Sequence, residues 1–292
     1  MKIGLIGLGY WGKIILKNLE QLGYKDITVC ESKDVDWSQI GSKYKLCKDY
    51  KKLKCDKVFV LTPATSHFDI CSFFLQKGID VFCEKPLDVD SKNCEKLFNL
   101  AEKNGSYLFV DWLFTFNPAV KEIKNLIQKE GKPKNILANR MNFGPVRSDV
   151  NARWDLASHD VSIAHYLLEE QPKEVSWIDF KRDPDSLQED SVVGVLSFEH
   201  TCVQINASWS YGKKDRQNIM EFDRGILEWH DNLNSLKYID KTIEIPAVSP
   251  LHCSINSFFD KNVEQRDLTL NITKSLNRES LLQQSKCSMG TH

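Results

Sequence analysis

Short apolar runs alternate with amphipathic segments of helical length in the first part of the chain. Polar residues, glycine or proline separate each run from the segment that follows it. Such runs are typical of buried strands, and repeated strand–helix units with short loops predict a parallel, doubly wound α/β sheet. The strands are expected at Ile3–Ile6, Ile27–Cys30, Lys57–Leu61, Ile79–Cys83 and Tyr107–Val110, with helices at Lys13–Leu22, His67–Gln76 and from Asp90 or Ser91 to Lys103.

The pattern changes near Pro118. Helices are expected at Ala119–Lys129 and Leu156–Leu168, and the remaining segments are short apolar or alternating runs between turn residues. This pattern predicts an open, largely antiparallel sheet in an α+β domain. Its strands are expected at Asn135–Asn142, Glu174–Phe180, Ser191–Phe198, Thr201–Ser210, Gln217–Phe222, Ile226–His230 and Lys237–Ile245. We therefore expect one domain at 1–118 and a second, for substrate binding and oligomerisation, at 119–292.

The first strand leads directly into a G-x-G-x-x-G motif made by Gly7, Gly9 and Gly12. In a Rossmann fold the first glycine permits a tight turn, the second lets the backbone approach a pyrophosphate, and the third lets the helix pack closely. The helix N-terminus offers unpaired N–H groups to the phosphates. The motif therefore predicts a dinucleotide site; the alternative is a glycine-rich turn without a ligand.

Glu31 ends the second strand, at the distance from the glycines where a dinucleotide fold places its ribose-binding acid. A carboxylate there hydrogen-bonds the ribose hydroxyls and repels a 2′-phosphate, which favours NAD over NADP. Ser32 and Lys33 follow directly and could accommodate a phosphate. An ordinary surface glutamate is the structural alternative.

Other chemically active residues also follow expected strands. Thr62-Pro63 and Glu84-Lys85 come at the ends of two of them. Ligands of doubly wound sheets bind beyond the carboxyl ends of the strands. The agreement of these positions with the glycine motif predicts one cofactor site at that edge.

Composition narrows the class of protein. The formal net charge is −1 with mixed charges along the chain, which excludes a general attraction to nucleic acid. Nine scattered cysteines without a C-x-x-C pair indicate a reducing compartment. With no signal peptide or apolar run of membrane-spanning length, a cytoplasmic protein is expected. The histidines lack the paired spacing of a metal site, so no metal is expected.

Four motifs give the chain a resemblance to the Gfo/Idh/MocA oxidoreductases over nearly its whole length. They are Gly-Leu-Gly-Tyr-Trp-Gly at 7–12, Thr-Pro-Ala-Thr-Ser-His at 62–67, Glu-Lys-Pro at 84–86 and Trp-Asp-Leu-Ala-Ser-His-Asp at 154–160. Within that family, Tyr-Trp-Gly at 10–12 resembles the branch acting on nucleotide-linked sugars, which includes UDP-N-acetylglucosamine 3-dehydrogenase-like proteins. So do Asn-Phe-Gly at 142–144 with Trp154, and Ser-Trp-Ser at 208–210 with Lys213, Lys214 and Arg216 nearby. Similar proteins usually carry Gly-His where this chain has Asp111-Trp112, beside the expected nicotinamide and substrate pocket.

The resemblance implies an NAD-dependent dehydrogenase that oxidises a ring hydroxyl, with C3 as a candidate position, of a nucleotide-linked sugar in surface-polysaccharide synthesis. It implies a homodimer or homotetramer, and a ketosugar product would suit a pathway aminotransferase. The alternatives are a free sugar or cyclitol dehydrogenase and, from another class, a non-catalytic NAD-binding scaffold or regulator. The implied cofactor-binding residues are Gly7, Gly9, Tyr10, Trp11, Gly12, Glu31, Thr62, Pro63, His67, Glu84 and Lys85.

The expected catalytic residues are Lys85, Asp155 and His159. A cationic lysine polarises the substrate oxygen, whereas a lysine deprotonated by burial and a positive nicotinamide ring acts as the base. Asp155 and His159 are four residues apart, hence on one helix face, and histidine exchanges protons near neutral pH. We expect His159 to accept the proton, Lys85 to polarise the oxygen and Asp155 to fix their geometry, with the three meeting at the interdomain cleft. Arg140, Asn142 and Trp154 are candidate substrate contacts, and Asp160 is expected to have a structural role.

Overall fold

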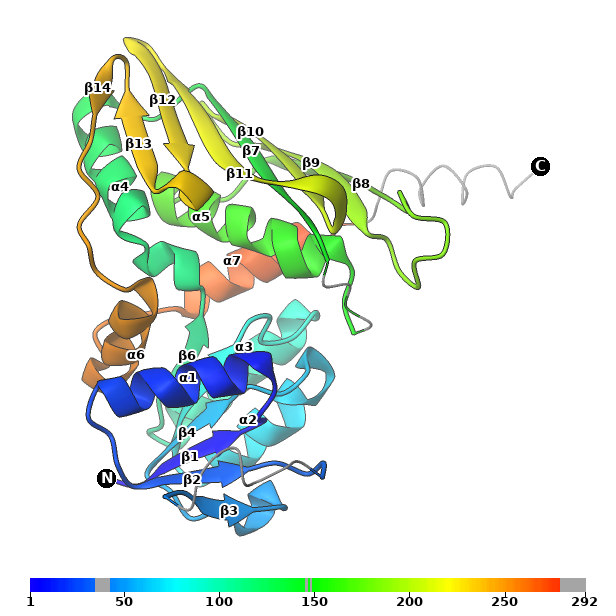
Figure 1. Ribbon diagram of the computed structural model, residues 1–292, viewed down its shortest axis with the longest axis vertical. Coiled ribbons are helices and arrows are strands. Elements are labelled where there is room, and N and C mark those ends of the chain that lie inside the picture. The colour runs from blue at the N-terminus through cyan, green and yellow to red at the C-terminus, as the bar shows by residue number, and fades with distance from the viewer. Residues whose placement is uncertain (35–42, 145–146, 148, 279–292) are drawn as a thin grey trace. The chain divides into compact units, whose positions relative to one another are not determined.

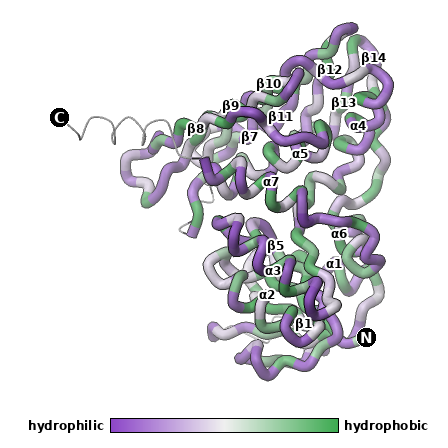
Figure 2. The backbone as a smooth tube through the Cα atoms, turned by 180° about the vertical axis from the view of Figure 1, so that it is seen from behind, coloured by the Kyte–Doolittle hydropathy of each residue, from purple (hydrophilic) through white to green (hydrophobic). Residues whose placement is uncertain are grey.

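The computed structural model describes residues 1–34, 43–144, 147 and 149–278 of the chain. The chain divides into two compact units. The first contains Met1–Trp112 and Leu251–Leu270, and the second contains Leu113–Pro250 and the chain from Asn271 onward. The division into domains at 1–118 and 119–292 stays a prediction; these units group 113–118 with the second and 251–270 with the first. In both units, apolar and polar segments alternate along the chain (Figure 2).

The first unit contains the predicted doubly wound sheet. Its strands are all parallel, in the order β3-β2-β1-β4-β5-β6, which confirms the fold class. The strands are β1 (Ile3–Ile6), β2 (Ile27–Cys30), β3 (Lys45–Cys47), β4 (Lys57–Val60), β5 (Asp80–Glu84) and β6 (Leu108–Asp111). The helices are α1 (Tyr10–Gln21), α2 (His67–Leu75), α3 (Ser91–Lys103) and α6 (Pro250–Asp260). The edge strand β3 was not expected, because it is short and mostly exposed.

Helix α6 was also not expected from the sequence. Its Phe258 packs edge-on against Phe59 of β4 and Phe82 of β5, with ring centroids 5.3 and 5.6 Å apart. Tyr107 adds a hydrogen bond to the Val263 carbonyl, beyond the end of α6. Aromatic burial of this kind dominates core energetics. It explains why a segment so late in the chain belongs to the first unit.

The second unit is built on the predicted large sheet, which has the order β14-β13-β12-β11-β7-β10-β9-β8. All its pairs are antiparallel except β10 with β7. Helices α4 and α5 lie along one face (Figure 1). The strands are β7 (Asn135–Phe143), β8 (Glu174–Phe180), β9 (Ser191–Ser197), β10 (Cys202–Ser208), β11 (Ser210–Phe222), β12 (Gly225–His230), β13 (Ser235–Tyr238) and β14 (Lys241–Thr242). The other helices are α4 (Pro118–Glu130), a π-helical turn (Arg153–Ala157), α5 (Ser158–Leu168) and α7 (Arg266–Leu276), which the division between the units crosses.

Several predicted boundaries in this unit are wrong. The expected strand Lys237–Ile245 is two strands, β13 and β14, because Ile239 takes a positive φ of 58° and turns the chain. Strand β11 begins at Ser210 rather than Gln217, with an irregular register before Asp215. The helix expected from Leu156 begins with the π-helical turn, and α7 was not expected at all.

The described residues show neither a helix long and apolar enough to cross a membrane nor a cluster of three or more His, Cys, Asp or Glu side chains suited to a metal ion. The cysteines among them are all free thiols. Cys287 lies outside the described residues.

Candidate active site

The glycine loop joins β1 to α1 and has the geometry that the motif predicts. Gly7 has a φ of 92°, which suits glycine. A Cβ on Gly12 would lie 2.0 Å from the Gly7 carbonyl oxygen, so the helix can approach the loop only without a side chain there. Gly9 is the N-cap of α1, and a Cβ on it would meet no atom within 4 Å. The loop thus leaves open space at a helix N-terminus that has no side-chain cap, which fits a pyrophosphate.

Glu31 lies beside this loop at the end of β2. The Leu8 backbone N–H donates to its Oε2 at 2.8 Å, and the Lys33 N–H donates to its Oε1 at 3.0 Å. The backbone therefore fixes the carboxylate next to the glycines, where it fits an adenosine ribose. Tyr10 is 78% exposed, and its ring meets Trp11 edge-on at a centroid distance of 5.9 Å.

His67, a predicted cofactor contact, is buried at the start of α2. Its Nδ1 lies 2.8 Å from the Pro86 carbonyl oxygen and its Nε2 lies 2.8 Å from the Thr62 carbonyl oxygen. The ring therefore links the segment after β4 to the segment after β5. These contacts fix the backbone next to Lys85, and direct contact of His67 with a cofactor stays a prediction.

Glu84, Lys85 and Asp111 lie at the carboxyl ends of β5 and β6, and all three are buried. Glu84 pairs with Asp111 in the parallel register. The Ser254 hydroxyl on α6 donates to Asp111 Oδ1 at 2.6 Å, whereas Oδ2 is buried and has no hydrogen-bond partner among the described residues. Burial raises the pKa of Asp111 to about 6, while the Ser254 hydrogen bond and the charge of Lys85 act in the opposite direction.

In the second unit, Asp155 lies in the π-helical turn and both of its oxygens accept hydrogen bonds. Arg147 Nη1 donates to Oδ1 at 3.2 Å, and Trp209 Nε1 donates to Oδ2 at 3.1 Å. Arg147 is also paired with Asp149 through two hydrogen bonds. Donors on both oxygens hold the Asp155 carboxylate in one orientation.

His159 lies in the first turn of α5, and its ring meets Phe114 at a centroid distance of 4.9 Å. Arg140 also contacts the Phe114 ring, with its guanidinium carbon 4.2 Å from the ring centroid. Arg140 and Asp160 are both buried and form a bidentate pair, at 2.7 and 3.0 Å. The pair supports the Phe114 ring that packs on His159.

Arg140, a candidate substrate contact, is buried inside the second unit. It is 2% exposed and bound to Asp160, because an arginine inside the unit needs a carboxylate partner. The expected structural role of Asp160 agrees with this pair. Trp154 is half-buried, and Asn142 donates to the Gly144 carbonyl at 2.6 Å. Substrate contacts by all three candidates stay predictions.

Sequence reasoning missed Arg147, Phe114 and Ser254 as members of this environment. Arg147 lies in a loop and Ser254 lies 143 residues from its partner, so no local pattern marks either of them. Phe114 begins the aromatic run that follows Asp111-Trp112, and nothing in that run marks its ring as a partner of His159.

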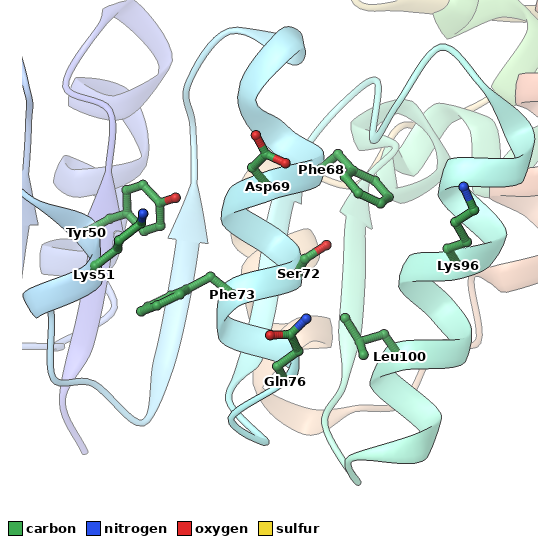
Figure 3. Close-up of a pocket in the computed structure, with 9 residues that line it drawn as sticks. All are labelled: Tyr50, Lys51, Phe68, Asp69, Ser72, Phe73, Gln76, Lys96 and Leu100. Atoms are coloured by element: carbon green, nitrogen blue, oxygen red, sulfur yellow. The ribbon is translucent and has the colours of Figure 1, made fainter.

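A separate pocket opens on the surface of the first unit, between the Tyr50 turn and helices α2 and α3 (Figure 3). It has a volume of about 540 Å³ and is lined by aromatic rings and by polar side chains such as Asp69 and Lys96. None of its lining residues is a predicted site residue.

Comparison with known families decides the class of the chain. Residues 1–112 match the family described as "Oxidoreductase family, NAD-binding Rossmann fold", and residues 131–228 match the "GFO/IDH/MocA C-terminal domain". The chain belongs to the Gfo/Idh/MocA oxidoreductase family. This confirms the resemblance found in the sequence motifs and makes the chain an oxidoreductase by family.

Relatives of this Gfo/Idh/MocA protein act on more than one substrate class. Inositol 2-dehydrogenase of Salmonella typhimurium is 24% identical over 235 residues, which cover 73% of this chain and 69% of that protein. UDP-N-acetylglucosamine 3-dehydrogenase of Acidithiobacillus ferrooxidans is 21% identical over 250 residues, which cover 84% and 76%.

Solved structures share the fold over nearly the full chain. The structure of the Acidithiobacillus ferrooxidans enzyme GnnA has a TM-score of 0.84 at 17% identity and covers 94% of this chain and 95% of its own. WlbA dehydrogenase of Bordetella pertussis, solved with NADH and UDP-GlcNAcA, has a TM-score of 0.78 at 16% identity and covers 93% and 92%.

Proposed function

We propose that this protein is an NAD-dependent dehydrogenase that oxidises a ring hydroxyl, at C3, of a nucleotide-linked sugar. The observation that carries the proposal is the combination, within a family of oxidoreductases, of a buried Lys85 at a parallel strand end with Asp155 in the π-helical turn and His159 four residues later in the first turn of α5. Oxidation of an alcohol requires that a carbon lose hydride and its oxygen lose a proton.

The glycine loop and Glu31 fit the cofactor. Gly9 and the N-terminus of α1 would hold the pyrophosphate, and Glu31 would bind the adenosine ribose. NAD, when bound, supplies the hydride acceptor. The side chains of the protein must bind the substrate, orient it and accept the hydroxyl proton.

Each of the three catalytic side chains has one task in the proposed mechanism. Lys85, as a cation, binds the substrate oxygen and stabilises the negative charge that develops on it. His159 accepts the hydroxyl proton. Asp155, held by Arg147 and Trp209, fixes the substrate or the imidazole in place. The Arg140–Asp160 pair supports the ring of Phe114 and so limits how far the His159 ring can turn.

Two features support a nucleotide-linked substrate. The UDP-N-acetylglucosamine 3-dehydrogenase relative covers most of this chain. Strand β11 also carries Lys213, Lys214 and Arg216, the first two exposed, and cations of this kind suit a diphosphate. The ketosugar product would be a substrate for an aminotransferase. The inositol dehydrogenase relatives make a free cyclitol the second candidate.

A substrate panel tests the proposal. Purified protein and NAD are mixed with UDP-linked hexoses, UDP-linked N-acetylhexosamines, the corresponding free sugars and inositols, and the absorbance of reduced cofactor is followed. We expect reduction with a UDP-linked sugar and none with its free sugar. Turnover of inositol alone would favour the cyclitol reading, and NAD binding without turnover of any compound would favour a non-catalytic role.

A further inference from the structure

Asp111 is a buried acid whose role in the reaction is still open. It is 1% exposed, and only Ser254 hydrogen-bonds to it among the described residues. An ionised carboxylate in such a place is costly unless a charge faces it. Its position at the end of β6, level with Glu84 in the register, places it beside the segment that carries Lys85.

The charge of Lys85 acts on this carboxyl. Lys85 favours the ionised form of Asp111, and so does the hydroxyl of Ser254, whereas burial disfavours it. Two other lysines near this sheet, Lys57 and Lys261, pair with Asp80 at the opposite end of β5. Glu84 lies level with Asp111 on β5, and His252 lies on α6 two residues before Ser254.

We propose that Asp111 is a positioning residue for Lys85: its carboxylate, held at one oxygen by Ser254, faces the lysine through the other oxygen and keeps the ammonium group in place for the substrate. The inference rests on the proposed catalytic role of Lys85.

The proposal predicts that the catalytic activity depends on pH near pH 6. Because the pKa of Asp111 is raised to about 6, its carboxylate is present above that pH and is neutralised as the pH falls through it. Once it is protonated, Asp111 no longer presents a negative charge to Lys85. Activity should therefore fall on the acidic side more steeply than protonation of the base His159 alone would give, with an additional ionisation near pH 6 that belongs to Asp111.

A titration of the full chain without substrate tests the contact. The carboxyl carbon of Asp111 is followed by NMR in ¹³C-labelled protein, with Asp111→Asn used for assignment. Lys85→Met should raise the Asp111 midpoint by about one pH unit or more, because an opposite charge is lost. Ser254→Ala should also raise it. Lys57→Met, which removes a largely buried lysine at the other end of the sheet, should leave it unchanged.

Kinetics on the substrate test the function of the contact. Asp111→Asn should lower kcat about tenfold or more and make the acidic fall in activity shallower, because only protonation of the base His159 then contributes to it, with little change in the KM for NAD. Asp80→Asn, a buried aspartate at the far end of β5, should keep the steeper fall. If Asp111→Asn is poorly folded, Ser254→Ala provides the alternative test, since it should move the acidic limb that belongs to Asp111 to higher pH.

The results separate this inference from the function on which it rests. An Asp111 midpoint that Lys85→Met leaves unchanged, or an acidic limb that neither Asp111→Asn nor Ser254→Ala alters, would overturn the positioning role. An Asp111 midpoint that moves as expected, in a protein whose Lys85→Met variant keeps normal turnover, would instead overturn the catalytic role of Lys85.

Discussion

At the scale of single residues, Glu31 owes its orientation to the backbone. The Leu8 N–H holds one carboxylate oxygen beside the glycine loop, which leaves the acid pre-organised for a ribose. We predict that the protein binds NAD more tightly than NADP and that Glu31→Ser weakens NAD binding. Hydrogen bonds to a charged group contribute about 1.5–3 kcal/mol, so the loss should be roughly 10- to 100-fold.

Fluorescence titration with both cofactors measures this preference. Glu20→Ser is the control, because Glu20 is a surface acid on α1 that pairs with Lys43. It should leave both affinities unchanged. Equal affinities of the unaltered protein for NAD and NADP, or a preference for NADP, would contradict the role of Glu31.

Arg140 provides a second test at this scale. Removing one member of a buried ion pair leaves an uncompensated charge and typically costs about 3–5 kcal/mol. Arg140→Met should therefore lower the free energy of unfolding by about that amount, measured by urea denaturation. Arg224→Met is the matched control, because Arg224 is 79% exposed and lies 3.6 Å from Glu130, and it should cost less than about 1 kcal/mol. Equal effects of the two changes would show that the Asp160 pair does not anchor Arg140.

At the scale of elements, two glycines of the β1–α1 turn have different roles: Gly12 is needed for packing, whereas Gly9 leaves room for the cofactor. Gly12→Ala should destabilise the protein without cofactor by about 1–3 kcal/mol, because the added methyl overlaps the Gly7 carbonyl. Gly9→Ala should leave that stability nearly unchanged, since its φ is −67° and the space is open. It should instead weaken NAD binding, because the methyl would fill the proposed pyrophosphate site. Normal NAD affinity in Gly9→Ala would place the pyrophosphate elsewhere.

Elements with a local signature were predictable from the sequence. The parallel strands other than β3, the glycine turn and α3 follow from short-range patterns, and the observed sheets confirm the fold class. Helix α6 was missed because its helical face is recognisable only from its aromatic partners on β4 and β5.

Around the candidate site, too, long-range partners could not be predicted from local sequence patterns. The motifs located Lys85, Asp155 and His159, but the partners of Asp155 could not be found from sequence. Trp209 is 54 residues away from it, and the Arg140–Asp160 pair that supports Phe114 spans 20 residues. Such pairs depend on which strands become neighbours, and alternation along a single strand does not reveal that.

At the scale of the whole molecule, the open sheet of the second unit predicts self-association. Apolar side chains lie partly exposed on its strands, including Leu137, Ile178, Val193 and Val195, and Ile178 pairs directly with Val193. Exposed apolar patches on a sheet usually mark an interface. Light scattering at micromolar concentration should show a dimer or tetramer, and Val193→Lys with Val195→Lys should dissociate it.

Leu187→Lys controls for a general effect of charge on solubility, because Leu187 is 79% exposed and lies outside the strands. It should leave the oligomer intact. A clean monomer of the unaltered protein across a wide range of dilution would refute the interface.

The central claim is that Lys85 and His159 carry out the chemistry, and turnover of single variants on the substrate found by the panel tests it most directly. General acid–base catalysis contributes about 10²–10⁴ in rate, so His159→Ala should lower kcat within that range while NAD affinity stays near normal. Lys85→Met should lower it at least as much, because it removes the cation and keeps most of the side-chain volume. Lys57→Met, the control lysine of the same unit, should retain turnover. Near-normal kcat in both Lys85→Met and His159→Ala would contradict the account.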